Sequence, residues 1–79
     1  MDNRLKELRG VKGWSQAALA DQVGTSRQTI NALENGRYDP SLPLAFRLAA
    51  VLETRIDQIF QPSLEDLGVR TQTNAAAGP

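Results

Sequence analysis

The sequence predicts an all-α fold, because apolar residues recur at helical spacing in several segments and because serine and glycine stand where helices begin and end. No segment shows the alternation of apolar and polar residues that is typical of a strand, and no internal repeat is present. Five helices with short connections are expected in one small domain. A chain of 79 residues buries only about 60% of its unfolded surface, so a partner subunit would add to its stability.

The first three helices are expected at residues 4–12, 16–23 and 27–35. Each has the apolar spacing of a helix with one buried face. Serines precede the second and third helices as capping residues, and glycines follow all three as left-handed stops. The expected inward residues are Leu5, Leu8, Val11, Ala17, Leu19, Ala20, Val23, Ile30 and Leu33; the caps are Ser15 and Ser26, and the stops are Gly13, Gly24 and Gly36.

The second half is expected to hold a longer helix at residues 42–52 and a short one around residues 57–60. Ser41 caps the longer helix, and Pro43 falls in its first turn, where the missing N–H of proline is harmless. Beyond Gln61 the signal for order weakens. We therefore expect one folded domain of residues 1–67 and a flexible tail of residues 68–79. The expected core residues of this half are Leu44, Ala45, Leu48, Ala49, Leu52, Ile56, Ile59 and Phe60.

Composition excludes several classes of function. The chain has no cysteine and no histidine, which excludes disulfides, thiol nucleophiles, zinc-thiolate sites and Ser-His-Asp triads. No apolar run approaches the ~20 residues that span a bilayer, and the N-terminus is unlike a signal peptide. We expect a cytoplasmic protein that is not an enzyme, does not enter a membrane and uses no metal, cofactor or small-molecule ligand.

Residues 16–36 predict a function. A helix with a small residue at Ala20, a tight turn at Gly24 and a second helix are typical of a helix-turn-helix. With Ile30 and Leu33 pointing inward, the polar residues left on the outer face are Arg27, Gln28, Asn31 and Asn35. These are side-chain types that read base edges in the major groove of DNA. The residues expected to grip the sugar-phosphate backbone are Gln16, Ser26, Thr29, Asn35, Arg37 and Tyr38.

Some of these residues allow another interpretation. On an arbitrary helix, Arg27, Gln28 and Asn31 would simply be solvated surface, and it is the turn in front of them that favours DNA. Trp14 is expected to cover the ends of the first two helices rather than to act as a wedge between bases. Tyr38 can pack on its loop or reach a phosphate with its hydroxyl, and the sequence favours neither.

Residues 5–60 resemble the XRE family, the phage repressor and Cro type of helix-turn-helix. The segments that carry the resemblance are Leu5-Lys-Glu-Leu-Arg, Ser15-Gln16, Leu19-Ala20, Val23-Gly24, Ser26-Arg-Gln-Thr-Ile-Asn, Leu33-Glu-Asn-Gly, Asp39-Pro40-Ser41-Leu42 and Ile59-Phe60. The chain is most similar to the compact, single-domain members. The resemblance implies a five-helix, lambda-repressor-like DNA-binding domain.

The resemblance also assigns roles to single residues. The positions that would face bases are Ser26, Arg27, Gln28 and Asn31, and those that would contact the DNA backbone are Gln16, Asn35, Arg37 and Tyr38. It implies a structural ion pair between Arg9 and Glu34. The sequence departs from some phage members at Ala32, where they carry a long polar side chain, so a smaller set of base contacts is expected.

Charge is distributed unevenly although the nine basic and nine acidic residues cancel. Residues 1–47 hold seven bases and five acids, a net charge of +2, and residues 48–79 hold two bases and four acids, a net charge of −2. So small an excess predicts weak binding by a monomer, since phosphate neutralisation supplies much of the affinity. We expect a homodimer on double-stranded DNA, with half-sites about 34 Å apart. The residues expected at its interface are Val51, Ile56, Ile59 and Phe60, with Leu64 and Leu67 as further candidates.

The sequence thus predicts a sequence-specific DNA-binding transcriptional regulator, a homodimeric repressor that binds a palindromic operator through the major groove. The alternative is a protein-interaction module, such as the antitoxin of a toxin-antitoxin pair. In that case the tail folds on its partner and DNA binding serves autoregulation.

Overall fold

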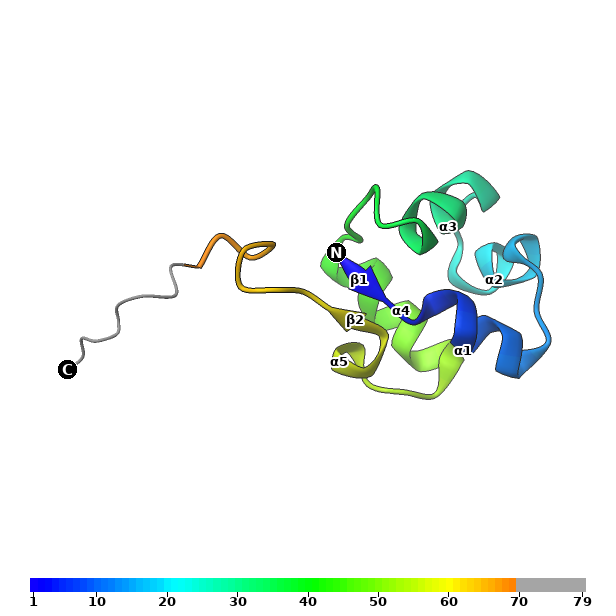
Figure 1. Ribbon diagram of the computed structural model, residues 1–79. Coiled ribbons are helices and arrows are strands. Elements are labelled where there is room, and N and C mark those ends of the chain that lie inside the picture. Colours follow the sequence, from blue (N-terminus) through cyan, green and yellow to red (C-terminus); the bar gives the residue numbers. More distant parts are fainter. Residues whose placement is uncertain (70–79) are drawn as a thin grey trace.

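The computed structural model describes residues 1–69 and confirms the all-α fold. Figure 1 shows the helices gathered in one body, with the chain after β2 leading away from it. The elements in order are β1 (Asp2–Asn3), α1 (Leu5–Lys12), α2 (Gln16–Val23), α3 (Arg27–Glu34), α4 (Leu42–Leu52), α5 (Ile56–Ile59) and β2 (Phe60–Gln61). The expected helix limits are correct to within one residue. The longest described helix, α4, has 11 residues, and none of the described helices could cross a membrane.

Local sequence signals set the helix ends as predicted. The side chains of Ser15, Ser26 and Ser41 each accept a hydrogen bond from the backbone N–H three residues later, at 3.0, 3.1 and 3.2 Å respectively. Gly13 and Gly24 end α1 and α2 in the left-handed conformation, with φ of 73° and 71°. These contacts satisfy backbone groups that a helix end otherwise leaves unpaired.

The core is one apolar cluster to which all five helices contribute. Its fully buried members include Leu5, Leu19, Val23, Ile30, Leu33, Leu48 and Ile59. Val11 is 80% exposed, so its expected place in the core was wrong. Steps of three residues fall about 60° short of a full turn, and two such steps carry Val11 away from the face of Leu5. Ala17 is also exposed, because two residues along a helix turn it to the face opposite Leu19.

A short antiparallel pair of strands corrects the expectation that no strand forms. β1 pairs with β2, with Asp2 opposite Gln61 and Asn3 opposite Phe60. The N–H of Arg4 extends the contact by donating to the carbonyl oxygen of Ile59 at 2.8 Å. Two-residue strands are too short to show an alternating pattern. They form here because the burial of Leu5 and Ile59 brings the two ends of the body together.

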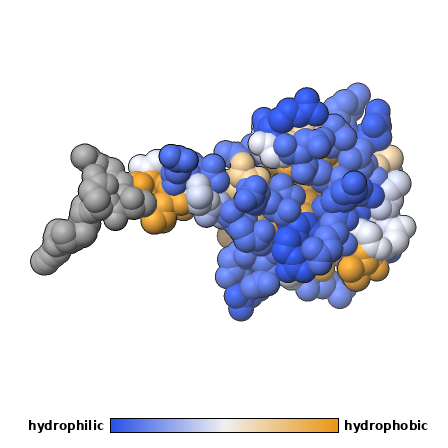
Figure 2. Space-filling model, in the orientation of Figure 1, coloured by the Kyte–Doolittle hydropathy of each residue, from blue (hydrophilic) through white to orange (hydrophobic). Residues whose placement is uncertain are grey.

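The described residues after β2 form a turn. Ser63 and Asp66 cap one another: the N–H of Ser63 donates to the Asp66 carboxylate and the N–H of Asp66 donates to the Ser63 hydroxyl, both at 3.0 Å. The turn exposes three apolar side chains, Leu64, Leu67 and Val69. Figure 2 shows hydrophobic colour on the segment next to the grey residues. Of the expected tail, residues 70–79 lie outside the described residues.

Candidate nucleic-acid interface

A tight turn joins α2 to α3. Gly24 has a φ of 71° and no heavy atom within 4 Å of the position a Cβ would take, so glycine is needed there for its backbone conformation and not for space. The N–H of Thr25 donates to the carbonyl oxygen of Ala20 at 3.0 Å. Ala20 is only 2% exposed. A small side chain at this position lets α2 and α3 approach each other closely.

The two faces of α3 differ sharply. Ile30 and Leu33 are buried, at 0% and 1% exposure. On the other side lies what we call the polar stripe, defined as Arg27, Gln28, Asn31 and Asn35. At about 100° per residue its members fall within about 100° of arc. Arg27, Gln28 and Asn35 are exposed and Asn31 is half-buried. The stripe can therefore meet a partner surface as a unit.

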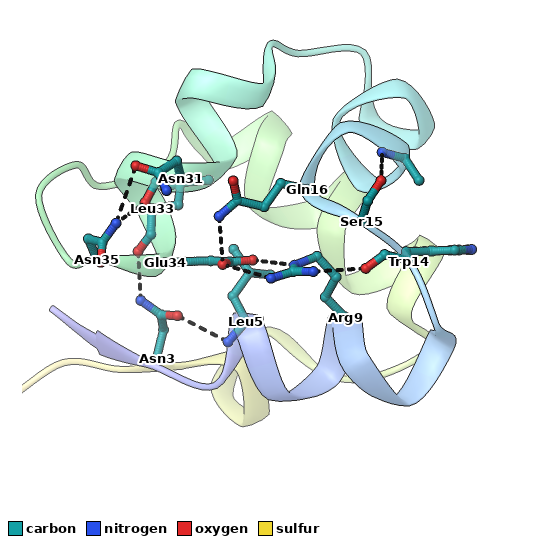
Figure 3. Close-up of polar contacts among 11 residues, drawn as sticks. Asn3, Leu5, Arg9, Trp14, Ser15, Gln16, Asn31, Leu33, Glu34 and Asn35 are labelled. Carbon is teal, nitrogen blue, oxygen red and sulfur yellow. Dashed lines mark hydrogen bonds and ion pairs between the residues drawn. The ribbon is translucent and has the colours of Figure 1, made fainter.

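Asn31 and Asn35 are bonded to each other within the stripe. The Asn35 side-chain Nδ2 donates to the backbone oxygen of Asn31 at 2.9 Å and lies 3.3 Å from its side-chain Oδ1. Figure 3 shows the Asn35 side chain, just after the end of α3, directed toward Asn31. The sequence interpretation treated them as separate contacts and missed this bond.

Hydroxyl groups and a loop flank the stripe. The Ser26 hydroxyl accepts from the Thr29 N–H at 3.1 Å and lies 3.0 Å from the Thr29 hydroxyl. At the other end, Gly36 has a φ of 71° and turns the chain away from α3. Arg37 and Tyr38 follow and are both exposed, Tyr38 at 46%. The exposed Tyr38 ring leaves its hydroxyl open to a partner.

Arg9 and Glu34 form a part-buried ion pair between α1 and the end of α3. The Arg9 Nε lies 2.6 Å from the Glu34 Oε2, and the side chains are 16% and 4% exposed. The hydrogen bond to Glu34 raises the pKa of Arg9 above its usual value. Arg9 Nη1 also donates to the Trp14 backbone oxygen at 2.8 Å. Trp14 itself is half-buried against the core, consistent with its expected covering role.

Gln16 joins this network. Its Nε2 donates to the Glu34 Oε1 at 3.0 Å. In Figure 3 the Gln16 Oε1 points away from the ion pair. An amide nitrogen carries two hydrogens, so Gln16 keeps a second one for another acceptor. No local pattern predicts this bond, since residues 16 and 34 are brought together only by the packing of α2 and α3.

The same network shapes the charge of the interface. Glu34 is the only acid in α3, and its carboxylate is almost fully covered by Arg9 and Gln16. The exposed charged residues nearest in sequence are then Arg27 within the stripe and Arg37 just after it, with Asp39 beyond. Figure 2 shows a largely hydrophilic surface over α3. A polar surface with a small positive excess suits a polyanion.

Two further contacts hold α2 and α3 in place, and the sequence interpretation missed both. Arg47 Nε on α4 donates to the Val23 backbone oxygen at 2.9 Å, which caps the end of α2. Asn3 Nδ2 donates to the Leu33 backbone oxygen at 2.8 Å, next to the end of α3. Neither could be found from the sequence, since each joins residues more than 20 positions apart.

The residues expected at a dimer interface do not share one surface. Ile59 is 0% exposed and Phe60 7%, both within the protein's own core. The expectation was therefore wrong for Ile59, and Phe60 can offer only an edge. Val51 and Ile56 are half-buried at the surface of the core. Ile56 and Phe60 line an open, mostly apolar hollow of about 300 Å³, whose other lining residues are Met1, Asp39, Pro40, Ala45, Asp57 and Pro62.

Comparisons with known proteins agree with this geometry. The family model described as helix-turn-helix matches residues 5–59. An uncharacterised HTH-type transcriptional regulator of Methanocaldococcus jannaschii is 48% identical over 60 residues, which are 76% of this chain and 91% of the relative.

Solved structures show the same arrangement of helices. The restriction-modification controller protein C.AhdI from Aeromonas hydrophila superposes with a TM-score of 0.67 at 37% identity, over 72% of this chain and 86% of that one. Bacillus subtilis SinR, described as a master regulator for biofilm formation and solved in complex with DNA, has a TM-score of 0.63 at 28% identity, over 67% of this chain and 86% of that one.

Proposed function

This chain belongs to the helix-turn-helix family of XRE-type transcriptional regulators, and we propose that it is a homodimeric repressor that binds a palindromic operator through α3. Its family and relatives point to a DNA-binding regulator and not to an enzyme. The observation that carries the proposal is the polar stripe, which stands exposed on a helix whose opposite face is buried.

Base reading is assigned to the start and middle of α3. Arg27 has the fork geometry that donates to guanine O6 and N7, and Gln28 has an amide that can pair with a base edge. Both side chains are exposed. Asn31 lies between them and the end of the helix, and Ser26 stands at its start. A second copy bound in the same way would read the other half of the palindrome.

Backbone contacts are assigned to both flanks. Gln16 keeps one amide hydrogen for a phosphate, while Glu34 holds the other. Thr29, Asn35, Arg37 and Tyr38 lie along or just beyond α3. These groups fix the register of a protein on DNA without reading sequence. The buried position of Glu34 keeps its negative charge away from the phosphates.

The dimer contact is assigned to the apolar surface around Ile56 and the edge of Phe60, with Val51 as a further candidate. Ile56 and Phe60 line the apolar hollow, and the turn that follows β2 exposes Leu64 and Leu67. Covering such side chains gains about 25 cal/mol for each Å² of apolar area removed from water. Two copies joined here would place two recognition helices on successive turns of DNA. Such a dimer would act in the cytoplasm. It would repress transcription by covering a promoter.

Selection of bound sequences from a random DNA pool with the purified chain tests the DNA-binding role. We expect an inverted repeat whose half-sites are separated by about one helical turn, roughly 34 Å. DNase footprinting should then show protection of both half-sites together. Recovery of unrelated sequences, bound no more tightly than random DNA, would contradict a sequence-specific role.

Sedimentation analysis tests the dimer separately. The exposed variant Leu64→Asp and the half-buried variant Ile56→Asp should both shift the protein toward monomer, and thermal denaturation of each variant checks its fold. Val11→Asp is the matched control, because Val11 is 80% exposed on α1, outside the proposed contact. A wild-type chain that stays monomeric at micromolar concentration, with and without its selected DNA, would contradict the dimer.

A further inference from the structure

The segment after β2, residues 63–69, is held together by its own hydrogen bonds, and we call it the arm. The N–H of Leu67 donates to the carbonyl oxygen of Ser63 at 3.2 Å, and Ser63 and Asp66 cap one another. All the hydrogen bonds that the structure gives the arm lie within it. Figure 1 shows this part of the chain leading away from the helical body. The arm is therefore a separate turn that its own body does not hold.

The arm has an apolar side that the described residues leave open. Leu64, Leu67 and Val69 are 51%, 55% and 49% exposed. The bond from Leu67 to Ser63 spans four residues, as in a helix, so Leu64 and Leu67 lie on the same side of the turn. Glu65, one residue after Leu64, is turned away by about 100°. A cluster of exposed apolar side chains, unlike a single one, is typical of an interaction site.

The apolar hollow begins where the arm begins. Pro62, the residue before the arm, lines it together with Ile56 and Phe60. Its volume of about 300 Å³ lies at the lower end of the range of pockets that bind apolar groups, about 300–1,000 Å³. Of its two acidic lining residues, Asp57 is bonded to Arg55 at 2.9 Å. The hollow can thus accept leucine side chains.

The hollow by itself offers too little surface for a stable pair of subunits. Phe60 and Ala45 are only 7% and 6% exposed, so most of their surface is already covered. A stable interface takes about 800 Å² from each partner. The exposed side chains of the arm supply apolar area that the hollow lacks. A second copy of the chain is the partner that uses both features, because it brings an arm for this hollow and a hollow for this arm.

We propose that two copies exchange arms, so that Leu64 and Leu67 of each copy pack into the hollow of the other. Two-fold symmetry makes the two contacts identical, and exchange of one element between copies is a low-cost route to a dimer. Because each arm starts at the edge of its own hollow, two hollows that face each other place each arm beside the other copy. The inference rests on the proposed function and makes its dimer contact a reciprocal one between arm and hollow.

Mixing two defective variants tests the exchange. The arm variant, Leu64→Asp with Leu67→Asp, keeps its hollow, and the hollow variant, Ile56→Asp, keeps its arm. Each variant alone loses both contacts, whereas a mixed dimer regains one, between the intact arm of the hollow variant and the intact hollow of the arm variant. Native mass spectrometry resolves the mixed dimer by its mass, and sedimentation equilibrium measures its affinity.

The mixed dimer should have a dissociation constant at least about tenfold lower than that of either variant alone, the scale of burying one leucine side chain. A chain that carries both defects is the matched control, and it should form no such mixed dimer with either variant. Thermal denaturation checks that each variant is folded.

Disulfide trapping gives an independent test that leaves the core unchanged. The chain has no cysteine of its own, so Val69→Cys on the arm and Asp39→Cys at the hollow can be placed in separate chains, both at exposed positions. Oxidation of the mixture should join the two variants. Val11→Cys, exposed on α1 and mixed with Val69→Cys, is the control and should give at least about tenfold less of the joined pair.

A single chain with both cysteines, Asp39→Cys and Val69→Cys, shows which copy the arm meets. A disulfide that forms only within one chain, at any concentration, would show that the arm folds onto its own hollow and would overturn the exchange. So would a wild type that dimerises while the two defective variants form no mixed dimer. A wild type that stays monomeric contradicts the dimer of the proposed function instead, so the two failures can be told apart.

Discussion

The Arg9 guanidinium grips the Glu34 carboxylate with two nitrogens, Nε at 2.6 Å from Oε2 and Nη2 at 3.2 Å from Oε1. This pair connects α1 to the last residue of α3, and Gln16 adds a third bond to the same carboxylate. One contact therefore sets the position of the recognition helix and covers the acid closest to the polar stripe. Stability and DNA binding depend on it together.

Glu34→Gln tests the structural part of this role. The substitution keeps the shape but leaves the Arg9 charge without a counter-ion in a part-buried place, so the free energy of unfolding should fall by about 3 kcal/mol. Urea denaturation followed by circular dichroism measures it. Glu7→Gln is the matched control, because the Arg4–Glu7 pair is exposed and such pairs add little. Equal stabilities for Glu34→Gln and the wild type would show that the ion pair is not structural.

Arg27→Ala and Gln28→Ala test base reading. Each should weaken binding to the selected operator by roughly 1–3 kcal/mol and affect binding to random DNA less. Fluorescence anisotropy with both kinds of DNA measures the difference. Gln58→Ala on α5 is the control, because Gln58 is exposed but lies on a different element from the polar stripe. Equal losses of affinity on both DNAs would show that Arg27 and Gln28 make sequence-independent contacts.

Replacing two glycines by alanine should change the stability of the chain in opposite directions. Gly24→Ala forces an L side chain into a left-handed conformation and should cost about 1 kcal/mol, although the added Cβ meets no neighbour. Gly10→Ala, inside α1 and also free of neighbours, should stabilise the chain by about 0.5–1 kcal/mol, since glycine weakens a helix interior. Thermal denaturation of the two variants compares them directly. The same sign of change in both would contradict the conformational argument.

The start of α5 supplies a pH-dependent contact. Arg55 Nε and Nη2 both donate to the Asp57 carboxylate at 2.9 Å, which holds the pKa of Asp57 below its usual value. The stabilisation is present above the ordinary pKa of an aspartate and is lost as the pH falls through the lowered one. Carboxyl-carbon NMR titration should show that Arg55→Met raises the pKa of Asp57. Glu7, whose pKa is lowered by Arg4, should be unaffected. An unchanged pKa of Asp57 in Arg55→Met would argue against this contact.

Short-range patterns allowed most of the helical framework to be predicted. Each helix is marked by residues within one turn of its ends, such as Ser15 before α2 and Gly24 after it. The polar stripe could be predicted as well, since helical spacing alone separates Asn31 from the inward Ile30. The failures have a physical cause too: Val11 is apolar, but six residues after Leu5 it lies about 120° around the helix from it, which places it in solvent.

Local sequence determines the set of helices, their inward faces and the polar composition of the outer face of α3, because these depend on residues at most four positions apart. The packing of the whole chain places Ile59 in the core rather than at an interface, pairs β1 with β2, and adds Gln16 to the expected pair of Glu34 with Arg9. Contacts of this kind join residues many positions apart, so no local pattern encodes them, and they form only when burial of the common core brings the helices together.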